Sequence, residues 1–268
     1  MLNRFLSFMK MIYVHRYMIK SFAFADLKKR YIGSFGGVFW SVIQPLAFIL
    51  TYYVVFSYFF KSKVSAEYGT ESYALWLIAG LLPWFFFSET VSRSTSAIFE
   101  NQALVTKTLF PSEIIPISLL VSGIINHVIG LAIFFCFSIG ITGGISAFSP
   151  LVLVYFVLLS VLVLGLSWGL SSLNVFMRDI GQFVTIALNL WFFYTPIFYP
   201  FGIIPKKLDF IFKLNPMYHA VEGYRDALVA SKMPDPYHLL YLFLFASASF
   251  VVGGLIYKRL KPAFADVL

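Results

Sequence analysis

The sequence predicts an all-α integral membrane protein with six transmembrane helices. Its composition is the first reason, because 60% of the 268 residues are hydrophobic, 20% are aromatic and only 12% are charged, whereas about a quarter of a soluble chain is charged. The second reason is that long stretches contain no Asp, Glu, Lys or Arg. These features exclude an ordinary soluble domain and a disordered chain, and the single cysteine, Cys136, excludes a disulfide scaffold.

The charge-free stretches predict where the spans lie. A helix needs about 20 apolar residues to cross the hydrocarbon core of a bilayer. The stretch 114–177 is too long for one helix, and Gly143, Gly144 and Pro150 predict a turn in its middle. We therefore expect six spans and a tail, at 31–60, 72–93, 114–142, 150–177, 180–200, 236–257 and 258–268. An even number of spans places both termini on the same side of the membrane.

The distribution of Lys and Arg predicts that this side is the cytoplasm. Thirteen of the 20 lie in segments on the side of the termini and seven on the opposite side, and basic residues gather in cytoplasmic loops. The segment 201–235 carries five of those seven, but four acidic residues leave it with a net charge of only +1. Apolar residues recur at helical spacing among the basic residues of 1–30, which favours a helix lying on the cytoplasmic face over a disordered basic tail.

Two of the predicted spans carry a polar stripe along one face. At 100° per residue, the stripe of the first span and that of the fifth each fall within a narrow arc. Such stripes turn inward in lipid, where they either join helices or line a path. An aromatic cluster around the fifth span offers rings on which sugars stack, so we predict a substrate path. Its candidate lining residues are Ser41, Gln44, Phe48, Tyr52, Gln182, Thr185, Asn189, Trp191 and Phe193.

Several other notable positions in the spans indicate helix packing and not a chemical function. Gly165 and Gly169 form a GxxxG surface on the fourth span, which is typical of close helix packing. His127 lies in the middle of a span, either as a functional group or as a neutral ring bonded to a neighbouring helix, and we favour the second interpretation. The sequence contains no P-loop motif and its four histidines are scattered. It therefore predicts neither a catalytic site nor a metal site.

Five segments in order along the chain resemble the permease subunit of bacterial ABC-2 type polysaccharide exporters, and O-antigen exporters are the nearest match. The segments are 26–45, 80–88, 100–111, 174–179, and 215–217 together with 224–226. They cover nearly the whole chain on a six-span frame with a basic N-terminal helix, which makes the combination fairly specific.

The resemblance implies a transport subunit and no enzyme. Two copies of the chain would form a channel with two copies of a separate ABC ATPase, and that ATPase would use ATP and Mg²⁺ while this chain binds no cofactor. The implied substrate is an undecaprenyl-pyrophosphate-linked polysaccharide that passes from cytoplasm to periplasm. The implied location is the bacterial inner membrane, among membrane lipids, with both termini cytoplasmic and without a nucleic-acid partner.

The resemblance also implies roles for three groups of residues. A cytoplasmic gate that meets the pyrophosphate matches Lys28, Lys29 and Arg30. A coupling helix that docks on the ATPase matches 98–111, with Glu100, Asn101, Leu104, Lys107 and Phe110. Re-entrant periplasmic gate helices match 201–235, with Glu222, Arg225 and Asp226.

Other functions remain open from the sequence. An ABC-2 permease of this kind also suits teichoic acid, capsule or a small hydrophobic drug. In a different class, an ion-coupled secondary transporter would work without any ATPase. A lipid-linked sugar-modifying enzyme would need a cluster of acids and bases at one interface, and the only pair of that kind is Glu89 with Arg93, at a spacing that indicates a structural contact.

Overall fold

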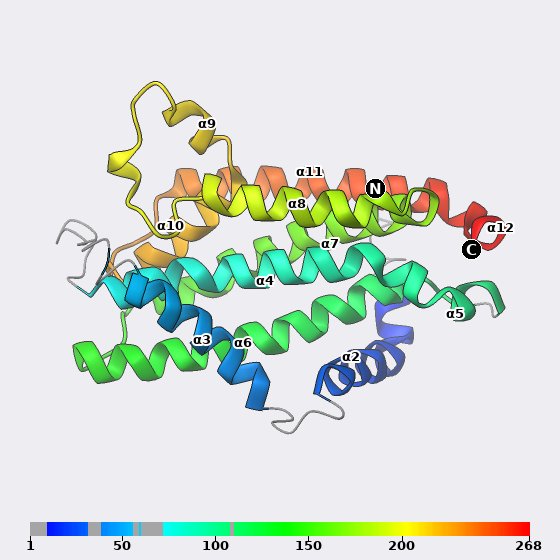
Figure 1. Cartoon of the computed structure of the whole chain (residues 1–268), viewed down its shortest axis with the longest axis horizontal. Coiled ribbons are helices and arrows are strands. Elements are labelled where there is room, and N and C mark those ends of the chain that lie inside the picture. Colours follow the sequence, from blue (N-terminus) through cyan, green and yellow to red (C-terminus); the bar gives the residue numbers. More distant parts are fainter. Residues whose placement is uncertain (1–9, 32–38, 56–58, 60–71, 108–109) are drawn as a thin grey trace.

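The protein is a helical bundle in which α4, α6, α7, α8 and α11 run side by side along the long axis (Figure 1). A computed structural model describes residues 10–31, 39–55, 59, 72–107 and 110–268, and no strand occurs in those ranges. The α-helices are α2 (Arg16–Tyr31), α3 (Trp40–Val54), α4 (Tyr73–Glu100), α5 (Gln102–Lys107), α6 (Ile114–Thr142), α7 (Val152–Phe176), α8 (Asp179–Tyr194), α9 (Asp209–Lys213), α10 (Pro216–Leu228), α11 (Pro236–Leu260) and α12 (Phe264–Val267). Short 3₁₀ turns are η4 (Ser149–Leu151), η5 (Phe201–Ile203) and η6 (Lys261–Ala263).

Turn and cap residues decide where several of these helices begin and end. Gly143 ends α6 in the left-handed region at φ 75°, which a glycine adopts without strain. Asn215 and Asp235 cap α10 and α11 by accepting a backbone N–H, and a proline follows each of them. The predicted turn after 142 is therefore confirmed.

Among the described residues, four helices are long and apolar enough to cross a membrane: α4, α6, η4 with α7, and α11 with its extension through α12. α3 and α8 occupy the predicted first and fifth spans, but their 15 and 16 residues fall short of the roughly 20 that a bilayer requires. The count of six spans therefore stays a prediction. The all-α membrane class is confirmed.

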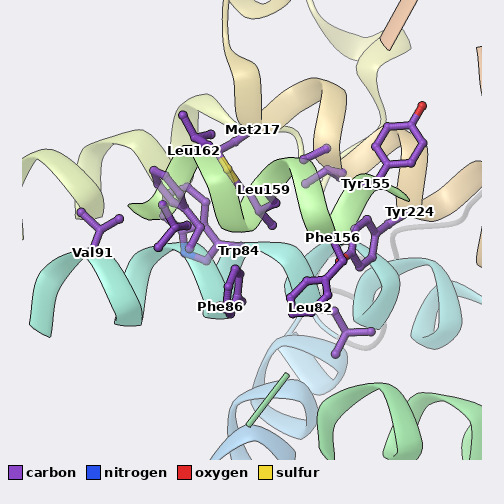
Figure 2. Close-up of a cluster of buried hydrophobic side chains, with 14 of the residues drawn as sticks. Leu82, Trp84, Phe86, Val91, Tyr155, Phe156, Leu159, Leu162, Met217 and Tyr224 are labelled. Atoms are coloured by element: carbon purple, nitrogen blue, oxygen red, sulfur yellow. The ribbon is translucent and has the colours of Figure 1, made fainter. Parts of the chain in front are cut away.

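The core lies where α4 packs against α7 and α10 (Figure 2). Trp84 and Phe86 of α4 meet Phe156, Leu159 and neighbouring side chains of α7, and all of them are less than a tenth exposed. α7 and α11 pack most extensively, because Gly165 and Gly253 let the two backbones touch. The GxxxG surface is therefore a packing surface, as predicted.

The boundaries at the α5 end of the bundle differ from the predicted ones. α4 continues past 93, the predicted end of the second span, to Glu100. Arg93 pairs with Asp26 of α2, which also accepts a hydrogen bond of 2.7 Å from Ser122. Lys28, Lys29 and Arg30, the predicted cytoplasmic gate, belong to the last turns of α2. Residues 1–9 of the predicted interface helix lie outside the described residues.

His127 has the structural environment that the sequence favours. Its ring is buried between α6, α7 and α10, where it stacks on Phe156 with centroids 4.3 Å apart. The hydroxyl of Tyr224 lies 3.0 Å from its Nε2. A packed, hydrogen-bonded ring of this kind joins three helices.

Candidate functional site

The polar stripe of α8 lies on the face that points away from the bundle. Gln182, Thr185, Asn189 and Phe193 are all exposed, and Phe193 is 62% exposed. The opposite face is buried against α4, with Val184, Leu188 and Phe192 as its contact residues. The stripe residues share one face of α8, but in the described chain this face points away from the other helices and not inward, and its role as a substrate path stays a prediction.

Aromatic rings connect α3, α4 and α8 beside this face. The ring of Tyr52 lies 5.7 Å from that of Phe192, and Phe48 lies 6.0 Å from Phe85. The structure thus brings the described part of the first-span stripe next to the inner face of α8. The side chains of Ser41 and Gln44 lie outside the described part of the chain.

Trp191 has a different position from the rest of the predicted lining. Its indole is partly buried, lies edge-on to Phe87 and donates a hydrogen bond of 2.7 Å to the side-chain oxygen of Asn215. The amide of Asn215 in turn donates to the hydroxyl of Thr195 at 2.9 Å. Trp191 therefore ties α8 to the start of α10, a role that its place in the sequence did not reveal.

Arg225 is the most extensively bonded charge of the α10 end. It is 2% exposed, lies over the ring of Trp76 at 3.4 Å, and donates to the carbonyl oxygens of Pro196 and Ile197 at 2.8 and 2.6 Å. The nitrogen that donates to Pro196, Nη1, also donates to the carboxylate of Glu222 at 2.8 Å. The Arg225 side chain thus supplies hydrogen-bond donors to the carbonyl oxygens that follow α8, and it fastens α10 to α4. The third predicted residue of this group, Asp226, pairs at 3.0 Å with the exposed Lys232.

A histidine pair joins α9, α10 and α11 at the same end. The Nε2 of His219 lies 2.7 Å from the carbonyl oxygen of Lys213, and its Nδ1 lies 2.7 Å from the Nδ1 of His238. Because a carbonyl oxygen only accepts, Nε2 of His219 carries the hydrogen, and Nδ1 accepts from His238. The ring also stacks on Tyr241 at 4.1 Å. The sequence did not reveal this pair, because 19 residues separate the two histidines.

A polar cavity of about 620 Å³ lies at the other end of the bundle, between α2, α4, α5 and α6. Lys29 from the predicted cytoplasmic gate lines it together with Glu100, Asn101 and Leu104 from the predicted coupling segment. Lys28 is exposed, and Phe110 packs on Phe22 with centroids 5.4 Å apart. The side chains of Arg30 and Lys107 fall outside the described residues. Two groups that are remote in sequence therefore meet at one place.

Comparison with known proteins assigns this arrangement to a family. Residues 17–229 match the ABC-2 type transporter family. The chain belongs to this family.

The curated relatives of this ABC-2 protein match it over most of their length. An O-antigen export system permease protein of Klebsiella pneumoniae is 31% identical over 91% of the chain and 92% of the relative. One of Myxococcus xanthus is 28% identical over 95% and 96%. A polysialic acid transport protein of Escherichia coli is 26% identical over 93% and 96%. Family membership and four apolar helices identify the chain as a multi-pass integral membrane protein.

The histidine pair predicts how the stability of this ABC-2 protein depends on pH. Burial lowers the pKa of His219 from 6.5 to about 4. Between pH 6.5 and pH 4, His219 is therefore protonated in the unfolded chain but neutral in the folded chain. The neutral His219 ring therefore contributes its full stabilisation of the folded state above pH 6.5, and this stabilisation is lost as the pH falls towards 4. We expect the melting temperature of purified protein to fall over this interval.

A glutamine at position 219 does not titrate, so His219→Gln should show a weaker decline over the same interval. His15→Gln, at a partly exposed histidine of the described N-terminal residues, should keep the decline of the wild type. Equal slopes for His219→Gln and wild type would contradict the assignment.

Proposed function

We propose that this chain is the permease subunit of an ATP-driven exporter that moves a lipid-linked O-antigen polysaccharide from cytoplasm to periplasm. The observation that carries the proposal is the exposed polar and aromatic face of α8. It is supported by the family and by two relatives that are O-antigen export system permease proteins. The lipid carrier that we propose is undecaprenyl pyrophosphate.

The α8 face favours a channel between two copies of the chain. The side-chain amides of Gln182 and Asn189 are exposed on a helix whose other side is apolar and buried. Lipid cannot satisfy amides, and each polar group left without a partner in hydrocarbon costs several kcal/mol. A second copy, or a hydrated path between copies, would supply the partners. The hydroxyls of a glycan would find amides there, and its rings would find Phe193 and Tyr194.

The energy source in this proposal is a separate ABC ATPase, present in two copies, that holds ATP and Mg²⁺. The sequence has no P-loop to bind a nucleotide, which is consistent with a transport subunit. The helix α5, which contains Leu104, would receive the ATPase together with Glu100 and Asn101, which precede it. The cavity next to it places Lys29 near this contact, where a pyrophosphate would be attracted on its way into the channel. Lys28 and Arg30 flank that position in the sequence.

The orientation that goes with this function has both termini in the cytoplasm of a bacterium and the protein in the inner membrane. The segment 201–235 would then lie on the periplasmic side as a gate. Arg225 supports a rigid part of that gate, because its contacts fasten α10 to α4 and to the end of α8.

Capsular polysaccharide is the second candidate substrate. The observation in its favour is the similarity to a polysialic acid transport protein over 93% of the chain. The lower identity of that relative places this candidate behind O-antigen.

Deletion in the native host distinguishes these functions. We expect loss of the polysaccharide from the cell surface and accumulation of lipid-linked glycan inside, with rescue by this gene only when an intact ATPase gene accompanies it. Loss of capsule with normal O-antigen would support the second candidate. Unchanged glycan in both pools, or rescue without any ATPase, would reject the exporter.

Substitutions on α8 test the proposed channel. We expect Phe193→Ala and Asn189→Leu each to lower export about tenfold, because a lost contact of ~1.4 kcal/mol changes a rate by that factor. Assembly of the two copies, measured by cross-linking, should be retained. Phe243→Ala is the matched control, because Phe243 is 51% exposed on α11 and would face lipid. Equal export by Phe193→Ala and Phe243→Ala would count against the lining.

A further inference from the structure

The helix α5 is too short to hold its own position. It has six residues, and isolated helices shorter than about 12 residues are marginal in water. Its stability must therefore come from its neighbours. In the described residues these neighbours are α4, which precedes it, and α12, which is remote in sequence. Figure 1 shows α5 and α12 at the same end of the bundle.

Ser112 and Glu113, which directly precede α6, are fastened to α7 and α11. The hydroxyl of Tyr257 donates a buried hydrogen bond of 2.8 Å to that of Ser112. Lys261 reaches Glu113 with 2.6 Å between Nζ and Oε1. The indole of Trp168 lies 3.4 Å from the backbone oxygen of Glu113. All three partners lie on α7 or at the end of α11, so Ser112 and Glu113 move with those helices.

The segment Lys261–Val267 folds back over these two residues. Its anchor is Phe264, which is 1% exposed and packs against the rings of Tyr257 at 5.6 Å and Phe176 at 6.2 Å. This anchor holds α12 against α5 and α7. α12 thus contacts α5 directly, and Phe110, which lies just before α6, packs on Phe22 of α2.

We infer that Lys261–Val267 is a brace that makes α5 move as one body with α7 and α11, with Lys261 and Phe264 as its positioning residues. This inference rests on the proposed function, in which α5 receives the ATPase. When the ATPase displaces α5, the movement reaches the channel only if α5 cannot move independently of α7 and α11. The ion pair of Lys261 with Glu113 fixes the position of the brace relative to the start of α6. The buried ring of Phe264 keeps the brace rigid. Without the brace, ATP would be hydrolysed while less polysaccharide is moved.

Hydrogen exchange of the α5 amides tests the brace directly, in the full-length protein and without any ATPase. Lys261→Glu and Glu113→Lys should each speed exchange about two- to fivefold, the size expected for a partly exposed ion pair, and the double charge exchange should restore it. Phe264→Ala should speed exchange by about tenfold or more, because a large buried side chain is lost. The matched controls are Lys258→Glu and Val267→Ala, at exposed positions of the same region.

The coupling readout is the ratio of polysaccharide exported to ATP hydrolysed, in cells and in the assembled transporter. We expect Lys261→Glu to lower this ratio about two- to fivefold with the ATPase still bound, and the double exchange to recover it. Unchanged α5 exchange in Lys261→Glu and Phe264→Ala would overturn the brace. Faster exchange with an unchanged ratio would overturn its role in coupling. Absence of any ATPase from the working transporter would instead reject the proposed function and leave the exchange result standing.

Discussion

Arg225→Ala is expected to destabilise the folded protein strongly and to lower its yield. The substitution removes a buried charge, leaves the carbonyl oxygens of Pro196 and Ile197 without their donor, and leaves Glu222 without its cation. Removing one partner of a buried ion pair costs about 3–5 kcal/mol, a large part of the roughly 5–15 kcal/mol that stabilises a folded chain. We expect a fall in melting temperature of roughly 10 °C, measured on purified protein in detergent, together with a low yield.

The geometry of Arg225 also predicts the result of a conservative change. Lys keeps the charge but lacks the planar fork that reaches two carbonyls and a carboxylate, so Arg225→Lys should recover only part of the loss. Arg178→Ala is the control, because Arg178 is exposed and its contact is the ring of Phe99 at 4.5 Å, worth about 0.5–1 kcal/mol. Equal melting temperatures for the alanine variants at 178 and 225 would show that the carbonyl contacts contribute nothing.

The second large effect is expected at the contact of α7 with α11. A methyl group at Gly253 would come within 1.9 Å of the carbonyl oxygen of Gly165. The carbonyl oxygen belongs to the backbone of α7, and the methyl carbon would be bonded directly to the backbone of α11. Neither can turn away, so Gly253→Ala must push the two helices apart. Close packing is the main attraction between membrane helices, because lipid is as apolar as their side chains. We expect a loss of about 1–3 kcal/mol or more, measured as a lower melting temperature.

Gly140→Ala is the matched control with the opposite expected sign. Nothing lies within 4 Å of a methyl group at Gly140, which is inside α6. Alanine is favoured over glycine in a helix by about 0.5–1 kcal/mol, so this variant should be slightly more stable than the wild type. A melting temperature of Gly253→Ala equal to that of Gly140→Ala would contradict the close contact.

Local properties of the sequence decided much of this structure. The scarcity of charge determined the membrane class, and Gly143 determined the end of α6, because a left-handed residue is a property of the backbone itself. The phase of the α8 stripe was also predictable, since a helix turns by 100° per residue whatever surrounds it. Asn189 and Phe193 therefore share one face of α8, whereas tertiary packing decided that this face points away from the bundle.

The partners of the polar side chains were decided only by the tertiary structure. Arg93 pairs with Asp26, 67 residues away, although Glu89 is its neighbour on the same helix face. Lys261 reaches Glu113 across 148 residues, and Arg225 bonds carbonyl oxygens that no side-chain pattern encodes. A charge at the end of an apolar helix has the same local signature whether it is solvated or paired. Its partner depends on how helices from distant parts of the chain pack together, and local periodicity contains no information about that packing.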